Sequence, residues 1–214
     1  MRLSALVVLT VLGAACAPQP DPPSPAATAT IRAVDPARIG RVRETLPPGY
    51  EVTPYAGVPT PLAVWGFVGP VEADPPQCLA DAAPPVHADS AQGWSASGPG
   101  GIVYAVVAAA ENDTFAGRGN CPLWTVSAGH TTGTVTGVPA PPVAAAETAG
   151  MATAATTVVE GGTETRAEAD TYVAHLGRFV CFVAVVTDPG SPYAPLDAAF
   201  AADLLTETVS TLRG

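Results

Sequence analysis

The sequence predicts an α+β fold in which a mostly antiparallel sheet packs against an N-terminal and a C-terminal helix. Short apolar or alternating runs, bounded by Gly and Pro, follow one another through most of the chain, as in a sheet of consecutive strands. Apolar residues recur at helical spacing before the first of these runs and after the last. The runs do not alternate with helical segments, which argues against a Rossmann-type parallel sheet.

The predicted N-terminal helix begins at Asp35, a capping residue that is followed by Pro36 at the first helical position. Its apolar residues fall on one face, at Ile39, Val42 and Leu46. The sequence Pro-Pro-Gly at 47–49 ends it.

Two strands are predicted next, at residues 50–53 and 62–68, because both runs are rich in β-branched and aromatic residues and are bounded by Gly and Pro. Residues 74–81 predict a short helix after a turn. Residues 84–101 are dense in Gly, Ser and Pro, which predicts a loop.

The second half of the chain predicts most of the sheet. Its strands are expected at residues 101–110, 123–128, 131–138, 151–160, 164–176 and 179–187. The first is almost continuously apolar, as in a strand covered on both faces. The fourth and fifth flank Gly161-Gly162 as the arms of a hairpin do, and the last is predicted to be a central strand.

The chain closes with a predicted helix at residues 196–212. Leu196, Phe200 and Leu204 repeat at a spacing of four residues, and Leu205 and Val209 widen the apolar stripe. A helix with one apolar side needs a sheet to cover.

Residues 1–15 have the organisation of a signal peptide: Arg2, an apolar run at 3–12, and small residues before Cys16. The run is too short to span a bilayer, which takes about 20 apolar residues. A cysteine directly after Gly-Ala-Ala predicts a lipoprotein, with Cys16 carrying acyl chains such as palmitate on the outer face of the plasma membrane. Gly13 stands where lipoprotein signals usually have Leu, and cleavage by an ordinary signal peptidase is the alternative.

Residues 16–33 predict a tether rich in Pro, Ala and Thr, and residues 34–214 a single domain. A proline-rich linker of this length extends to about 40 Å, at about 3.1 Å per residue. Its threonines are either glycosylation sites or part of a plain disordered spacer.

The chain is acidic, with 19 Asp and Glu against 9 basic residues, all of them Arg, and a net charge of −10. Such a surface repels phosphate backbones and anionic headgroups, which argues against nucleic-acid binding and against electrostatic docking to membranes. Attachment to the membrane is therefore expected through covalent lipid.

Once Cys16 is lipidated, Cys78, Cys121 and Cys181 remain, and three thiols form at most one disulfide. The expected pair is Cys121 with Cys181, because both adjoin strand-like apolar runs. Cys78 is then a small buried apolar residue or, alternatively, a reactive thiol.

No catalytic or metal-binding motif emerges. Ser95 lies in Gly-Trp-Ser-Ala-Ser-Gly, but a nucleophile elbow needs Gly two residues after the Ser, where Ser97 stands. The histidines are scattered singly, at His87, His130 and His175, without metal-ligand spacing. The acidic run at 164–170 is typical of a solvated face. The sequence therefore predicts a non-enzymatic domain without metal or cofactor.

Four aromatic residues are candidate ligand contacts, because aromatics near Gly- and Pro-rich loops can line a groove: Trp65, Phe67, Trp94 and Trp124. The alternative is that they fill the core, which is favoured for Trp65 and Phe67. Trp94, in a predicted loop, is the best candidate for an exposed contact.

Four segments, DPARI at 35–39, LPPGYEV at 46–52, LAVWGF at 62–67 and DPPQC at 74–78, resemble a mycobacterial lipoprotein domain of unknown function. That group is similar to the extracellular sensor domain of the mycobacterial kinase PknH. The resemblance implies an antiparallel sheet backed by helices, with a cleft proposed for ligand binding in the kinase sensors. It supplies no catalytic residue. Those sensors carry two disulfides, whereas three mature cysteines allow one.

The predicted function is therefore that of a lipid-anchored envelope protein with a sensor-like domain that binds a small molecule, a glycan or a lipid. The alternative is an adaptor that binds an envelope enzyme or transporter. A pocket beside the sheet favours the first, and an exposed apolar patch favours the second.

Overall fold

The computed structural model describes residues 32–112 and 121–214. The predicted signal peptide, Cys16 and nearly all of the predicted tether lie outside the described residues. The described part of the chain contains no helix that is long and apolar enough to cross a membrane.

A nine-stranded sheet with antiparallel pairing organises the described residues, in the order β1-β3-β4-β9-β8-β7-β6-β5-β2. The strands are β1 (Glu51–Pro54), β2 (Glu72–Asp74), β3 (Gln92–Gly98), β4 (Gly101–Ala109), β5 (Leu123–Ala128), β6 (Thr131–Val138), β7 (Glu147–Val158), β8 (Glu164–His175) and β9 (Phe179–Thr187). Strands β5 to β9 are neighbours in the order in which they follow one another along the chain, and β9 then pairs with β4. The predicted antiparallel α+β architecture is confirmed in broad terms.

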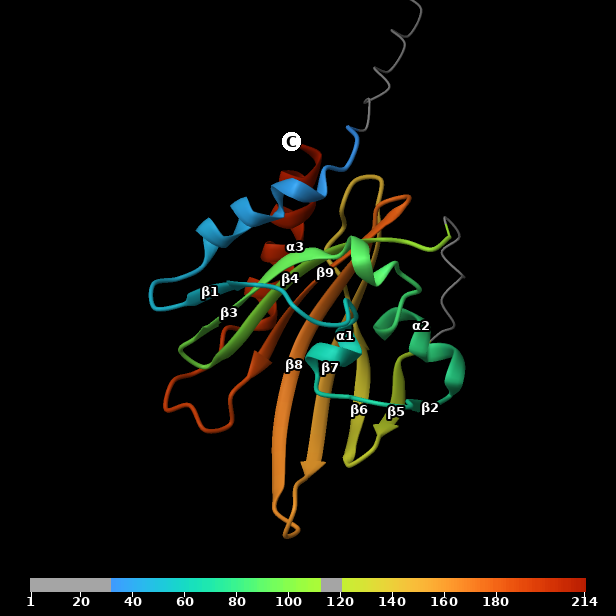
Figure 1. The fold of residues 1–214 in the computed structure, drawn as a ribbon, viewed down its shortest axis with the longest axis vertical. Helices are drawn as coiled ribbons and strands as arrows, with labels where there is room; N and C mark the ends of the chain where they lie inside the picture. The colour runs from blue at the N-terminus through green and yellow to red at the C-terminus, as the bar shows by residue number, and fades with distance from the viewer. Residues whose placement is uncertain (1–31, 113–120) are drawn as a thin grey trace, which may run out of the picture. The chain divides into compact units, whose positions relative to one another are not determined.

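The helical elements are short apart from two. They are the 3₁₀ helices η1 (Pro36–Thr45), η2 (Pro76–Cys78) and η3 (Ala88–Ser90), and the α-helices α1 (Pro61–Val64), α2 (Leu79–Ala82) and α3 (Ala198–Arg213). Figure 1 shows α1 in front of the central strands and α3 behind them. The sheet is therefore covered on both faces.

Each face of the sheet has its own apolar core, because strand side chains alternate between faces. In β4, Val103 and Val107 pack with η1 and α3, on what we call the α3 face. Val106, between them in sequence, packs with α1 and the segment around Cys78, on the α1 face. Because both faces of β4 are buried, residues 101–110 are almost continuously apolar, as the prediction of a strand covered on both faces assumed.

The predicted N-terminal α-helix is wrong in type. Residues 36–45 form the 3₁₀ helix η1, in which Ile39 and Val42 are buried. A spacing of three residues puts side chains in line on a 3₁₀ helix, whereas an α-helix would also have used Leu46. Leu46 instead follows the helix in extended conformation, as expected before Pro47.

The strand predicted at residues 62–68 is also wrong. Thr60 caps a helical turn there, its Oγ1 accepting from the Ala63 N–H (3.4 Å), and Pro61 occupies the first helical position. The aromatic residues that suggested a strand, Trp65 and Phe67, directly follow α1 and are buried in the core.

The loop predicted at residues 84–101 is wrong in part, because it contains β3. Trp94 and Ala96 are buried on one face of that strand, while on the other face Ser95 is half-buried and Ser97 is exposed. This alternation of buried and exposed residues is short, and its Gly and Ser residues are typical of a loop, so the sequence did not predict a strand. The short edge strand β2 was missed as well.

The remaining predictions are confirmed to within a few residues: the short helical segment after residue 74, the strands β1, β4, β5, β6, β7, β8 and β9, and the C-terminal helix α3. The β7–β8 hairpin around Gly161-Gly162 is confirmed with a longer first arm, since β7 begins at Glu147.

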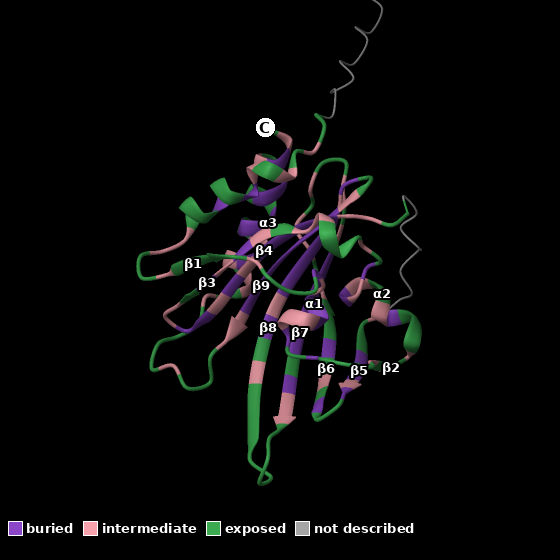
Figure 2. Ribbon diagram, viewed as in Figure 1, coloured by how far each residue is buried: buried purple, intermediate pink, exposed green. Residues whose placement is uncertain are grey.

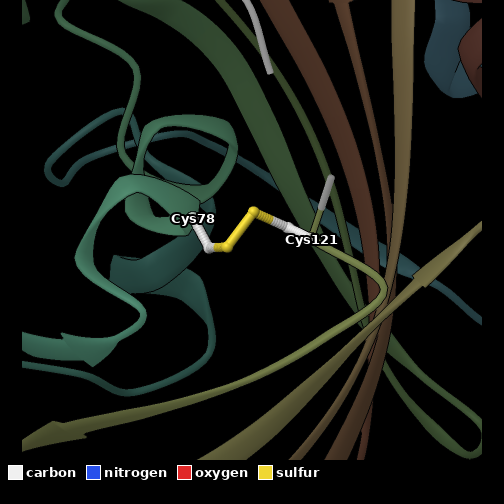
Figure 3. Close-up of a disulfide and its surroundings, with 2 residues drawn as sticks. All are labelled: Cys78 and Cys121. Carbon is white, nitrogen blue, oxygen red and sulfur yellow. A yellow bond between two sulfur atoms is a disulfide. The ribbon is translucent and has the colours of Figure 1, made fainter. Parts of the chain in front are cut away.

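The disulfide predicted between Cys121 and Cys181 is wrong. Cys121 is bonded to Cys78, with Cα atoms 5.7 Å apart (Figure 3). Both lie on the α1 face, where the bond joins the short helical segment to the chain that enters β5. Cys181 is buried in the core of the α3 face, so the sheet itself separates it from Cys121.

We expect the Cys181 thiol to be inert in the folded protein. Burial raises its pKa from 9.0 to about 12, against a smaller lowering by Arg213. Because the thiolate is the reactive form, only about one thiol in ten thousand is ionised at pH 8. Mass spectrometry after iodoacetamide treatment should find the Cys181 peptide unlabelled in buffer and labelled in urea. Rapid labelling in buffer would contradict this.

Candidate functional site

All four aromatic candidates are core residues rather than ligand contacts. Trp65, Phe67, Trp94 and Trp124 are each at most 4 % exposed. The Trp65 Nε1–H donates to Thr171 Oγ1 (2.9 Å), which satisfies both polar groups in the core. Phe67 packs so closely over Gly133 that a Cβ there would lie 2.8 Å from the ring.

Trp94, predicted to be the most exposed of the four, is buried under η1. Its Nε1–H donates to the carbonyl oxygen of Ile39 (3.1 Å), so it fastens the 3₁₀ helix to β3. The prediction failed because the residue was placed in a loop, whereas it lies on the inward face of a strand.

The polar residues considered for catalysis or metal binding do not form a site. The Ser95 and Thr53 hydroxyls lie 3.0 Å apart and bond to each other across β1 and β3. No group of three His, Cys, Asp or Glu residues that could hold a metal ion occurs in the stretches 32–112 and 121–214.

A groove of about 380 Å³ lies on the α3 face, over the part of the sheet next to the start of α3. Four strands and the segment that leads into α3 contribute to it. Its lining consists of Thr134, Thr136, Ala152, Thr153, Ala154, Glu168, Ala169, Asp170, Val185, Thr187, Pro195, Leu196, Asp197 and Ala198.

The groove exists because the strands are longer than the helix that covers them. β7 and β8 have 12 residues each, and the small residues Ala152 and Ala154 leave space above the sheet. Residues 195–198 form one wall as the chain turns into α3. No aromatic residue occurs among the described residues of the lining, so none of the four predicted aromatic contacts lines this groove.

Three carboxylates give the groove its charge. Burial raises the pKa of Asp170, and the negative charges of Glu168 and Asp197 raise it further. Asp197 also caps α3, its Oδ1 accepting from the Phe200 N–H (2.8 Å). No ion pair to any of the three occurs within the described residues. The groove therefore concentrates negative charge without a cation to balance it.

We expect Asp170→Asn to raise the free energy of unfolding at pH 7. The folded-state pKa of Asp170 lies above the ordinary 3.8, so its ionisation destabilises the folded protein as pH rises past that value. The gain should disappear below about pH 3.5, where the carboxyl is protonated in both states. Urea unfolding at the two pH values measures it, with Glu51→Gln on exposed β1 as the control. A less stable Asp170→Asn protein at pH 7 would contradict this.

Part of the site was visible in the sequence. Glu168 and Asp170 stand two residues apart on a predicted strand, which puts them on one face, although that run was interpreted as a solvated face. Asp197 and the threonines were missed. Their positions depend on how β6 and the start of α3 meet β8, and no local pattern carries that information.

Residues 35–213 match the family model described as a domain of unknown function, DUF5642. A comparison with curated proteins finds no match. A solved structure, described as a putative uncharacterized protein (Rv0999 ortholog) from Mycobacterium smegmatis, is 21% identical with a TM-score of 0.63. The alignment covers 85% of this chain and 98% of that one, and it shows a shared fold.

The extracellular domain of PknH from Mycobacterium tuberculosis is a more distant match, 14% identical with a TM-score of 0.40, over 81% of this chain and 90% of that one. That likeness is too low to support an argument from structure. The family match, in contrast, spans nearly all the described residues. The chain belongs to the DUF5642 family, which confirms the resemblance found in the sequence to a mycobacterial domain of unknown function.

Proposed function

We propose that this protein is a lipid-anchored, non-enzymatic binding protein of the cell envelope, and that its groove holds a small organic cation in a sensor-like role. The observation that carries the proposal is the groove itself: a concave site on the α3 face with three carboxylates and, among the described residues, no positive charge paired with them. Its volume of about 380 Å³ falls within the range typical of small-molecule sites.

The lining narrows the class of ligand. Carboxylates attract an ammonium or guanidinium group, and the hydroxyls of Thr134, Thr136 and Thr187 add hydrogen-bonding positions. Among its described lining residues the site has no aromatic side chain on which a sugar ring would stack, and its three carboxylates favour a cation over an uncharged lipid chain. Because no metal-holding cluster occurs among the described residues, an organic cation fits better than a metal ion.

Location outside the cytoplasm is supported by two independent features. The leader ends in Cys16, as in lipoproteins. The Cys78–Cys121 disulfide is typical of an oxidising compartment.

Mass measurement of the purified protein tests the lipid anchor. We expect a mature N-terminus at Cys16 carrying acyl chains, and Cys16→Ala should release the protein from membranes. An unmodified secreted chain would remove the anchor.

Native mass spectrometry of the protein purified from its own envelope tests the ligand. We expect a retained organic cation that is lost from Glu168→Gln/Asp170→Asn and kept by the control Glu51→Gln, which lies on the edge strand β1, outside the groove lining. Spermidine serves as a probe in calorimetry, with binding that weakens as salt is raised. A retained lipid or neutral glycan, or spermidine binding that the double variant leaves unchanged, would refute the cation groove.

A further inference from the structure

The outer half of β8 is an open sheet edge. β8 pairs with β7 from Glu164 to His175, but its pairing with β9 starts at Ala169. Residues 164–168, which we call the β8 open edge, therefore have a strand partner on one side, and no other described strand pairs with them. Figure 1 shows the hairpin reaching beyond the neighbouring strands, and Figure 2 shows this part of it exposed.

The chain after β9 does not close this edge. β9 ends at Thr187, and the Asp188 N–H then donates to the Gly100 carbonyl oxygen (3.0 Å). Ser191 Oγ accepts from the Gly100 N–H (3.1 Å). Both contacts turn the chain toward the β3–β4 connection, on the side of β9 away from β8.

The backbone of the open edge points outward at alternate residues. The Glu168 N–H donates to Thr187 Oγ1 (2.8 Å), and the Leu176 N–H donates to the Phe179 carbonyl oxygen (2.8 Å), so even-numbered residues of β8 face β9. By the two-residue period of a strand, the N–H and C=O of Glu164 and Arg166 face the open side. Such groups form a template for another strand.

The charged side chains of β8 determine which kind of partner strand can bind at the open edge. The side chains of Glu164, Arg166, Glu168 and Asp170 share the α3 face, which gives three acids and one base. Among the described residues, Arg166 forms an ion pair with Glu164 alone, at 3.6 Å, and both are exposed, so this ion pair is weak. The edge also leads into the acidic groove, because Glu168 belongs to both and Thr187, which accepts from the Glu168 N–H, lines the groove as well.

We propose that the β8 open edge is a docking site for an extended, basic segment of a partner protein, which adds to the sheet as a tenth strand. Its backbone pairs with Glu164 and Arg166, and every second side chain is Lys or Arg, directed toward Glu164, Glu168 and the groove. The partner residues that alternate with these Lys or Arg residues lie next to Thr165 and Ala167, and they are small or β-branched. Strand addition of this kind derives affinity from main-chain hydrogen bonds and specificity from alternate side chains. A second copy of this chain is a poorer occupant, because each carries a charge of −10.

Nuclear magnetic resonance of the ¹⁵N-labelled full-length protein tests this site directly. The probe is a capped seven-residue peptide of alternating Arg and Thr. We expect it to slow hydrogen exchange of the Glu164 and Arg166 amides by about tenfold or more at saturation, as new ladder bonds do. The same peptide with Glu in place of Arg should not bind, and neither should one N-methylated at the positions that donate to the edge.

A matched pair of variants separates the backbone from the charge. Arg166→Pro removes the outward N–H at a position where an edge strand tolerates proline, whereas Arg166→Thr removes the same charge and keeps the N–H. We expect Arg166→Pro to lose about tenfold or more in affinity and Arg166→Thr to lose none. If Arg166→Pro does not fold, the N-methylated peptide makes the same comparison from the side of the probe.

Several results would overturn the docking site: no protection of the two amides at millimolar Arg-Thr peptide, equal binding of the Glu peptide, or equal binding by Arg166→Pro. Protection without peptide, together with a dimer mass, would assign the edge to a second copy instead. The groove and the edge share Glu168, but Arg166 lies outside the groove lining. Arg166→Pro should therefore lose the peptide and keep spermidine, so either proposal can fail without the other.

Discussion

Removal of the Cys78–Cys121 disulfide is expected to lower the free energy of unfolding by about 4 kcal/mol. The two cysteines are 43 residues apart in sequence, and a cross-link over that distance restricts the unfolded chain by about this amount in the chain-entropy model. Single domains are typically stable by only about 5–15 kcal/mol. The Cys78→Ala/Cys121→Ala protein should therefore be marginally folded at 37 °C.

Urea unfolding followed by tryptophan fluorescence measures this loss, since all three tryptophans are buried. Reductant should destabilise the native protein by a similar amount and leave the double variant unchanged. Cys181→Ala is the matched control: it removes a buried sulfur on the other face without removing a cross-link, and it should keep its sensitivity to reductant. A double variant within about 1 kcal/mol of the native protein would contradict the stabilising role of the bond.

The fold was predictable where a single segment contained the whole signal. The apolar period of α3 and the hairpin around Gly161-Gly162 depend on near neighbours in sequence, and both were confirmed. η1 and α1 were mistaken because their residues satisfy two periods at once. Ile39 and Val42 fit a 3₁₀ helix as well as an α-helix, and an apolar aromatic run as short as 62–68 fits a buried helix as well as a strand.

The disulfide pairing and the groove could not be predicted from the sequence, for a different reason. Cys121 and Cys181 both adjoin strands, but the face on which each side chain lies depends on the register of the whole sheet. Glu168 and Asp197 line the same groove only because the chain returns over the sheet into α3 after β9. Contacts of that range follow from topology rather than from local pattern.

Replacement of Trp94 by Ala is expected to destabilise the protein by about 3–5 kcal/mol, the usual cost of deleting a buried Trp side chain. Trp94 is 3 % exposed and contributes to the core beneath η1. The measurement is urea unfolding followed by far-ultraviolet circular dichroism, which does not rely on the residue removed.

Trp94→Phe separates packing from hydrogen bonding. It keeps most of the buried ring but leaves the Ile39 carbonyl oxygen without the Nε1–H that it accepts at 3.1 Å, which costs about 1–3 kcal/mol. The order Trp, Phe, Ala in falling stability therefore identifies a core residue that fastens η1 to β3. Had Trp94 been an exposed ligand contact, both variants would remain within about 0.5 kcal/mol of the native protein, and that result would return it to the list of binding residues.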